Sequence, residues 1–186
     1  MPQPLIDPVL TSVLRAARDA ARAGRGLLLH LDGDELVVVA ADGDDTARAI
    51  GHRIAAGRGV VGFVAATGQP IALRPTSTDE RLADDVGADL GWAPGAVLAV
   101  PCAGEDGIVG VLELLAPLDG GTFDFDAVED ATLLAGVAAA ALDASHVGAA
   151  VPTPTELGGG LERLAAADPA RYVHVAGLVQ ALLDRG

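Results

Sequence analysis

A glycine-rich run is the first candidate for chemistry in this sequence. Residues 57–62 read Gly-Arg-Gly-Val-Val-Gly, the G-x-G-x-x-G pattern that holds a dinucleotide when it follows a buried strand and opens a long helix. Here the apolar segment ends at Thr67, because Gly68 is typical of a helix C-cap and Pro70 cannot continue a helix. A helix of about eight residues, roughly 12 Å, is too short for the crossover of a parallel βαβ unit. The run therefore favours a short capping helix over a nucleotide site.

Thiol and imidazole side chains are the next candidates. The single cysteine, Cys102, excludes an intramolecular disulfide and a multi-cysteine metal site. Free cysteine commonly packs as a small apolar side chain, and we favour this interpretation over chromophore attachment or redox sensing. The four histidines show no spacing typical of a metal triad. A haem needs one axial imidazole in a large apolar pocket, so haem ligation through His30 or His52 stays open, and no cofactor is assigned.

Charge and composition disfavour several classes of partner. Twelve basic residues stand against 26 acidic ones, a net charge of −14, and the sequence contains neither Lys nor Asn. A surface this acidic repels phosphate backbones and anionic lipid, so nucleic acids and membranes are disfavoured as partners. The N-terminus has no basic region followed by an apolar core, and uncharged runs such as 131–142 fall short of the ~20 residues that span a bilayer. We expect a cytoplasmic protein of bacterial composition.

Apolar spacing predicts the elements that position these residues. Residues 5–23 have helical spacing, and the face expected to pack comprises Leu5, Val9, Val13, Ala16 and Ala20. Five segments have strand character: 27–31, 35–41, 70–74, 96–102 and 108–115. The turn Asp32-Gly33-Asp34 joins the first two as a hairpin. Residues 46–56 leave helix and irregular structure open.

The last two strands are apolar on both faces, so both faces must be covered. One face is expected to carry helices and the other the irregular segment 46–92. The longest helix, 125–146, is capped by Asp124 or Asp126. Its apolar positions are expected to face the sheet or a partner, and they are Val128, Leu133, Leu134, Val137 and Leu142.

The sequence divides into a first domain and an appendage. Residues 1–146 contain all the expected strands and form the first domain. Residues 147–160 contain Pro152, Pro154 and three successive glycines, which is typical of a linker. Residues 161–186 are expected to form a helical extension.

The ordered set of motifs over residues 8–146 resembles the GAF domain. The motifs are Gly59-Val60-Val61-Gly62 with Thr67-Gly68-Gln69-Pro70, then Ala99-Val100-Pro101, then residues 107–114. This resemblance implies an α+β fold with a central antiparallel sheet of five to six strands. The N- and C-terminal helices lie on one face, and short helices and loops roof a pocket on the other.

Family members sense cyclic nucleotides, haem, bilins or metabolites, or only dimerise, and one branch reduces free methionine sulfoxide. The cyclic-nucleotide branch carries Asn and Lys in its signature, and this chain has neither, so Asp79-Glu80 is favoured as a helix cap. The reductase branch uses several cysteines, and Cys102 stands alone. With no nucleophile, base and orienting group assembled, we expect no enzyme.

The resemblance implies a pocket lined by small aliphatic side chains, which favours a compact, apolar or weakly polar ligand over a purine. The residues expected to bind it are Phe63, Ile71, Arg81, Trp92, Leu98, Val100, Cys102 and Leu112, with Leu82 beside them. Arg81 and Arg74 are the cations near the roof, so one of them is expected to meet any anionic group of a ligand. Glu113 is expected at the sheet rim or paired with an arginine, because burying it unpaired is costly.

Two functions remain open. The first is a sensor domain that binds a small ligand and signals through helix packing and a separate partner protein. The second is a ligand-free dimerisation module with a collapsed pocket. Apolar helix faces predict a homodimer in either case.

Overall fold

The computed structural model describes residues 7–74, 79–93, 95–145, 154–167, 169, 172–173 and 176. The chain divides into two compact units, Met1–Gly148 and Ala149–Gly186. In the second unit, helix α5 spans Pro154–Ala167. The expected linker therefore does not extend through 154–160, because Pro154 opens a helix at the first helical position, where its missing N–H is tolerated. Of the predicted extension, 161–167 are helical, and most later residues lie outside the described part.

The first helix, α1 (Pro8–Ala20), begins at Asp7, whose carboxylate accepts from the N–H groups of Val9 and Leu10. Its buried residues are Leu10, Leu14 and Ala17, whereas Val9 is 56% exposed. The predicted packing face is wrong at Val9, Ala16 and Ala20, which are exposed, whereas Val13 packs against the edge of the cluster. Leu5, also assigned to that face, lies outside the described residues. Two apolar stripes have helical spacing in this segment, and burial of the larger leucines releases more apolar surface from water.

Six strands form one sheet, which confirms the expected fold class. They are β1 (Ala23–Asp32), β2 (Glu35–Gly43), β3 (Arg53–Ala55), β4 (Ile71–Leu73), β5 (Val97–Gly104) and β6 (Gly107–Pro117). Their order is β3-β2-β1-β6-β5-β4, and all five pairings among the described strands are antiparallel. Gly33, at φ +66°, turns the β1–β2 hairpin, in which Asp32 pairs with Glu35. An antiparallel sheet has no parallel crossover, which removes the dinucleotide-fold interpretation of residues 57–62.

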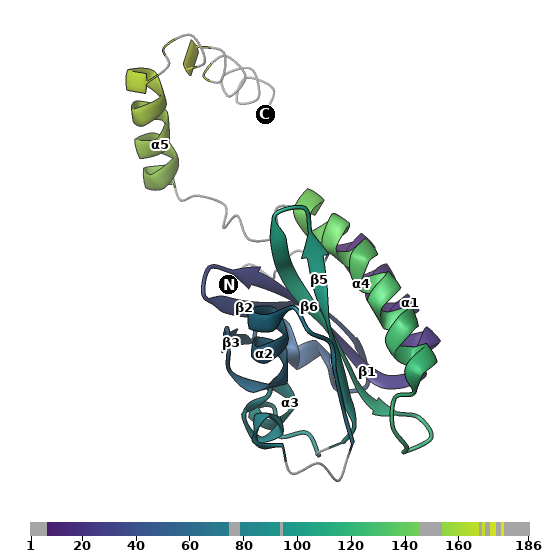
Figure 1. Cartoon of the computed structure of the whole chain (residues 1–186). Coiled ribbons are helices and arrows are strands. Elements are labelled where there is room, and N and C mark those ends of the chain that lie inside the picture. The colour runs from purple at the N-terminus through teal and green to yellow at the C-terminus, as the bar shows by residue number, and fades with distance from the viewer. Residues whose placement is uncertain are drawn as a thin grey trace. The chain divides into compact units, whose positions relative to one another are not determined.

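Helices α1 and α4 (Phe125–Ser145) lie side by side on one face of this sheet (Figure 1). Asp124 caps α4 by accepting from the N–H of Ala127 at 2.9 Å. The helix packs against the sheet mainly through alanines and Leu142, and these residues are Ala127, Ala131, Ala135, Ala138, Ala139 and Leu142. Leu133 and Val137 are instead 69% and 52% exposed. Small side chains bring the helix close to the strands, so the larger residues point outward.

Short helices cover the opposite face (Figure 1), and we call them the roof. They are η1 (Ala47–Ala49), α2 (Gly59–Thr67), η2 (Glu80–Asp84) and α3 (Val86–Asp89). The predicted short helix is confirmed, and it ends at Gly68 in the left-handed conformation, φ +67°. Asp79 caps η2 through the N–H of Arg81, as the sequence predicted. Both sheet faces are therefore covered, each by its own apolar cluster.

Candidate functional site

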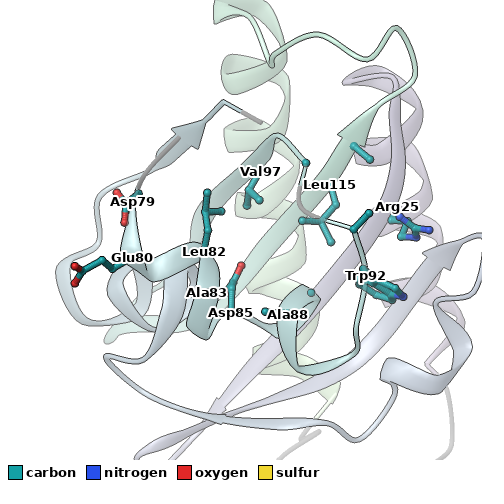
Figure 2. A pocket seen from close by; sticks show the side chains of 14 residues that line it. Arg25, Asp79, Glu80, Leu82, Ala83, Asp85, Ala88, Trp92, Val97 and Leu115 are labelled. Atoms are coloured by element: carbon teal, nitrogen blue, oxygen red, sulfur yellow. The ribbon is translucent and has the colours of Figure 1, made fainter. Parts of the chain in front are cut away.

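A cavity of about 530 Å³ lies between η2, α3 and the end of the sheet. Figure 2 shows Leu82 and Asp85 on one side of it and Trp92 with Arg25 on the other. Val97 of β5 and Leu115 of β6 form its floor. Most of its remaining lining is alanine and glycine. A volume of this size matches the range of small-molecule sites.

Of the residues expected to bind a ligand, the structure places Trp92 in this cavity, and Leu82 lines it as well. Four others, Leu98, Val100, Cys102 and Leu112, belong to the cluster under α1 and α4. They lie on the opposite face, so the expectation that they line the pocket is wrong. Side chains alternate along a strand, and because these strands are apolar on both faces the sequence could not tell which set points to which layer.

Phe63, Ile71 and Arg81 belong to the roof side but do not line the cavity. The Arg81 guanidinium lies over the Phe63 ring, 4.3 Å from its centroid. Its Nε and NH2 donate to the two carboxylate oxygens of Asp79 at 2.8 and 2.5 Å. These bonds lower the pKa of Asp79 to about 2. Arg81 is thus held by a neighbouring carboxylate rather than presented to a ligand.

Asp85, at the junction of η2 and α3, is a lining residue that sequence reasoning missed. Its side chain is buried, and its Oδ1 accepts from the N–H groups of Val60 and Val61 at 3.1 and 3.3 Å. Helix α2 has no cap from its own N-cap side chain, Arg58. A carboxylate about 25 residues further along the chain therefore satisfies the first N–H groups of α2.

Gly59 makes room for this contact. Its φ is +69°, and a Cβ atom there would stand 2.8 Å from both Asp85 Oδ1 and the Asp84 carbonyl oxygen. Glycine is therefore required here for the backbone conformation and for the close approach of Asp85. The glycine-rich run has the pattern of a nucleotide-binding loop, but here it allows the Asp85 carboxylate to approach the first N–H groups of α2. The sequence contained no signal that singles out Asp85, because it is one of 26 acidic residues and its burial is visible only in the structure.

Glu113 lies in the middle of β6, paired with Leu27 of β1 and Ala99 of β5. Those two neighbours belong to the roof-side cluster, so Glu113 points to the roof. It is fully buried, and within the described part of the chain its carboxyl oxygens have no partner at ordinary hydrogen-bond distance, although the Asp85 carboxyl is close enough to act on it. Burial, and secondly the charge of Asp85, raise the pKa of Glu113 well above its ordinary value. The expectation of a rim position or an arginine partner is therefore wrong.

Trp92 forms the wall of the cavity opposite Asp85. The guanidinium groups of Arg25 and Arg48 lie 5.1 and 5.9 Å from its ring centroid, in cation–π geometry. Arg25 also donates from Nε to the carbonyl oxygen of Asp44 at 3.0 Å. Two arginines thus hold the tryptophan ring in place, Arg25 from within the lining and Arg48 from outside it.

Neither histidine considered for haem lines the cavity. Burial lowers the pKa of His30, and among the carboxylates that oppose this effect is Asp143 of α4, which places His30 near the helix layer. His52 meets Asp89, Nε2 to Oδ2, at 3.2 Å, and Arg58 donates to both oxygens of the same carboxylate. These bonds lower the pKa of Asp89. His52 belongs to an ion cluster on the roof.

Cys102 is fully buried under the helices, and burial raises the pKa of its thiol to about 12. Its interpretation as a packed apolar side chain is confirmed. Among the described residues, no three metal-ligating side chains are grouped together, and no helix is both long and apolar enough to cross a bilayer.

Comparison with known proteins agrees with this geometry. The model of the family described as GAF domain matches residues 6–142. No curated protein matches the sequence. Among solved structures, the second GAF domain of DevS from Mycobacterium smegmatis superposes with a TM-score of 0.60 at 21% identity, over 74% of this chain and 93% of that one.

Two further structures show the range of functions on this fold. The GAF domain of a phosphoenolpyruvate-protein phosphotransferase from Coxiella burnetii has a TM-score of 0.62 at 23% identity, over 75% of this chain and 86% of that one. The free methionine-R-sulfoxide reductase from Neisseria meningitidis has a TM-score of 0.57 at 21% identity, over 74% and 77%. At these identities the likeness shows the fold alone.

Proposed function

Because this chain belongs to the GAF domain family, whose members are generally regulatory modules, we propose that it is a non-catalytic sensor that binds a small ligand in the cavity beneath η2 and α3. The open volume of about 530 Å³ beside Trp92 carries this proposal. A collapsed pocket, as the alternative dimerisation module requires, would leave no such space. The ligand is compact and largely apolar, because alanine, glycine, leucine and valine make up most of the lining.

The proposed signal passes through Asp85. This residue lines the cavity and also holds the first N–H groups of α2. A ligand that displaces or polarises the carboxylate changes the capping of α2, and α2 packs directly on β5 and β6. A ligand shifts this equilibrium only by its differential affinity for the two arrangements. A separate signalling protein then binds the rearranged roof differently.

Native mass spectrometry of protein purified from its host, with an absorption spectrum, tests ligand binding. We expect a copurified mass that is released on unfolding. The matched variants are Ala88→Trp, which fills the cavity, and Ala66→Trp, which adds the same ring at an exposed position on α2 outside the lining. The first should lose the copurified mass and the second should retain it. Equal retention by both variants overturns the proposal.

We also propose that the chain forms a homodimer through α4. Phe125, Leu133 and Val137 are 77%, 69% and 52% exposed on that helix, and large apolar side chains gathered on an exposed helix are typical of an interaction surface. Light scattering after size exclusion should give a dimer mass, and Leu133→Glu should give a monomer with an unchanged circular dichroism spectrum. A monomeric wild-type protein refutes the dimer and leaves the sensor intact.

A cytoplasmic location completes the proposal. The fully buried, unpaired Cys102 and the absence of a spanning helix among the described residues are compatible with it. Fractionation of the host cell with an antibody to this chain tests the location, and recovery in the membrane or periplasmic fraction would contradict it.

A further inference from the structure

The cavity of the proposed sensor has an uneven charge distribution. Its lining contains three acidic residues, Asp79, Glu80 and Asp85, and one cation, Arg25. The Arg25 guanidinium lies over the Trp92 ring and donates to a backbone carbonyl. Asp79 is bound by Arg81. Among the described residues, the buried polar groups that remain in the lining are the carboxyl of Asp85 and the indole N–H of Trp92, which has no hydrogen-bond partner.

A second carboxyl stands directly behind Asp85. Glu113 shares the roof-side face of β6 with Leu115, which forms the cavity floor. Its oxygens are buried without a hydrogen-bond partner at ordinary distance among the described residues, and Asp85 is the neighbouring charged group that acts on it. The elements packed against Glu113 contribute apolar side chains, namely Leu27 from β1, Ala99 from β5, and Val60 and Val61 from α2. Two carboxyl groups thus meet in an apolar environment, and no arginine of the described ranges is among the groups that act on Glu113.

Two adjacent buried carboxyls cannot both be ionised without a compensating cation. In the free protein the proton on Glu113 serves that purpose, because burial and Asp85 favour the protonated acid. An ammonium group entering the cavity supplies the same positive charge. Exchange of the Glu113 proton for an ammonium ion leaves the buried net charge unchanged, which avoids most of the cost of burying a new charge.

We propose, resting on the sensor function above, that the cavity takes a compact organic cation, a primary ammonium group on an apolar skeleton, and that the Asp85–Glu113 pair selects it. The ammonium group donates to Asp85. Glu113 releases its proton to solvent and becomes the second carboxylate facing the cation. The apolar skeleton packs against Leu82, Val97 and Trp92. When Asp85 accepts a hydrogen bond from the ligand, its hydrogen bonds to the N–H groups of Val60 and Val61 weaken. The charge of the ligand thereby affects the capping of α2 in the roof.

Matched probes test the charge selection. Primary alkyl- and arylalkyl-ammonium ions, including hexylammonium and 2-phenylethylammonium, are titrated by calorimetry against the full chain, each with the alcohol and the carboxylate of the same skeleton. We expect the ammonium to bind about tenfold or more tightly than the alcohol, the effect of one charge-assisted hydrogen bond. The carboxylate should bind most weakly, because acidic side chains outnumber Arg25 in the lining.

Proton release distinguishes this mechanism from simple packing. Titrations in phosphate and in Tris, which differ in ionisation enthalpy, should report release of about one proton per ammonium bound near neutral pH. Glu113→Gln should remove the proton release and weaken ammonium binding while leaving alcohol binding unchanged. Glu105→Gln makes the same substitution in the exposed β5–β6 turn and serves as the control.

The outcomes separate this inference from the sensor proposal. Equal binding of ammonium and alcohol without proton release overturns the amine specificity and leaves the sensor function standing. Preferential binding of carboxylates overturns it in favour of recognition by Arg25. No binding by any skeleton also overturns it, and the copurified ligand then decides the sensor function by itself. If Glu113→Gln fails to fold, proton release by the wild-type chain still decides the question.

Discussion

The two faces of the sheet are built in different ways. On the helix side, α1 packs leucines against β1 and β2, α4 packs a row of alanines against β5 and β6, and the cluster is apolar. On the roof side, an apolar cluster surrounds two buried carboxyls, and the covering helices are short. Their positions depend on side-chain contacts such as Asp85 with α2 and Arg58 with Asp89.

This difference separates stability from ligand recognition within one sheet. The helix side is closely packed, and close packing allows little rearrangement without cost. The roof side retains a cavity and depends on hydrogen bonds that a ligand can exchange for its own. The four predictions below test this division, beginning with the largest effect.

Truncating a leucine on the helix side should destabilise the protein most. Leu14→Ala removes a fully buried side chain from the α1–α4 cluster, with an expected loss of about 2–5 kcal/mol in the free energy of unfolding. Leu82→Ala, at the half-buried cavity wall, should cost about 1 kcal/mol or less, because the lost group already borders empty space. Chemical denaturation of both variants measures the difference. Equal losses would remove the distinction between the faces.

Substituting Gly59 should be the most costly glycine change in the roof. Gly59→Ala combines a left-handed backbone with a Cβ placed 2.8 Å from Asp85 Oδ1, and we expect a loss of about 1–3 kcal/mol. Gly51→Ala is the control, because its φ is +82° and a Cβ there meets nothing within 4 Å. It should show only the backbone penalty. Thermal melts compare the two, and a larger effect at Gly51 would argue against the Asp85 contact.

The pH dependence of stability should report the charge of Glu113. Its raised pKa in the folded protein means that its full contribution to stability is present only below the ordinary glutamate value of 4.5, and is lost as pH rises through the raised pKa. Glu113→Gln carries no titrating group at this position. Its free energy of unfolding should therefore exceed that of the wild type by about 1–3 kcal/mol as the pH rises from 5 to 8. Denaturation curves across this range measure the gap. Parallel pH profiles would show that Glu113 ionises freely.

The smallest effect concerns Cys102 on the helix side. Because its thiol is buried and its pKa is raised to about 12, a disulfide reagent at pH 8 should leave the native protein unlabelled. Labelling should begin only when denaturant unfolds the chain, at the rate of global unfolding. Rapid labelling of native protein would mean that the helix layer opens locally.

Local sequence signals predicted most of the elements. Asp32-Gly33-Asp34 predicted the hairpin, and Gly68 and Pro70 predicted the end of α2. Asp124 or Asp126 was predicted to cap α4, and the structure uses Asp124. Each of these depends on backbone geometry within a few residues. Segment 46–56 stayed undecided because η1 and β3 are only three residues long. A three-residue element has no period to detect.

The candidate site was largely hidden from the sequence. Trp92 and Leu82 were expected at the cavity and line it, but Leu98, Val100, Cys102 and Leu112 face the helices. When a strand is apolar on both faces, its sequence does not indicate which residues face the helices α1 and α4 and which face the roof.

Residue periods and turn chemistry in the sequence determined the first hairpin, the capped helices and the two-sided cover. The antiparallel sheet of five to six strands was implied by the resemblance of the ordered motifs to the GAF domain. Only the tertiary structure decided which side of each strand meets the helices. It also brought Asp85 to the N–H groups of Val60 and Val61 and left Glu113 buried beside it. Contacts between residues 25 or more positions apart depend on how the roof and the helices pack on the sheet. No local sequence pattern predicts which of these distant residues come into contact.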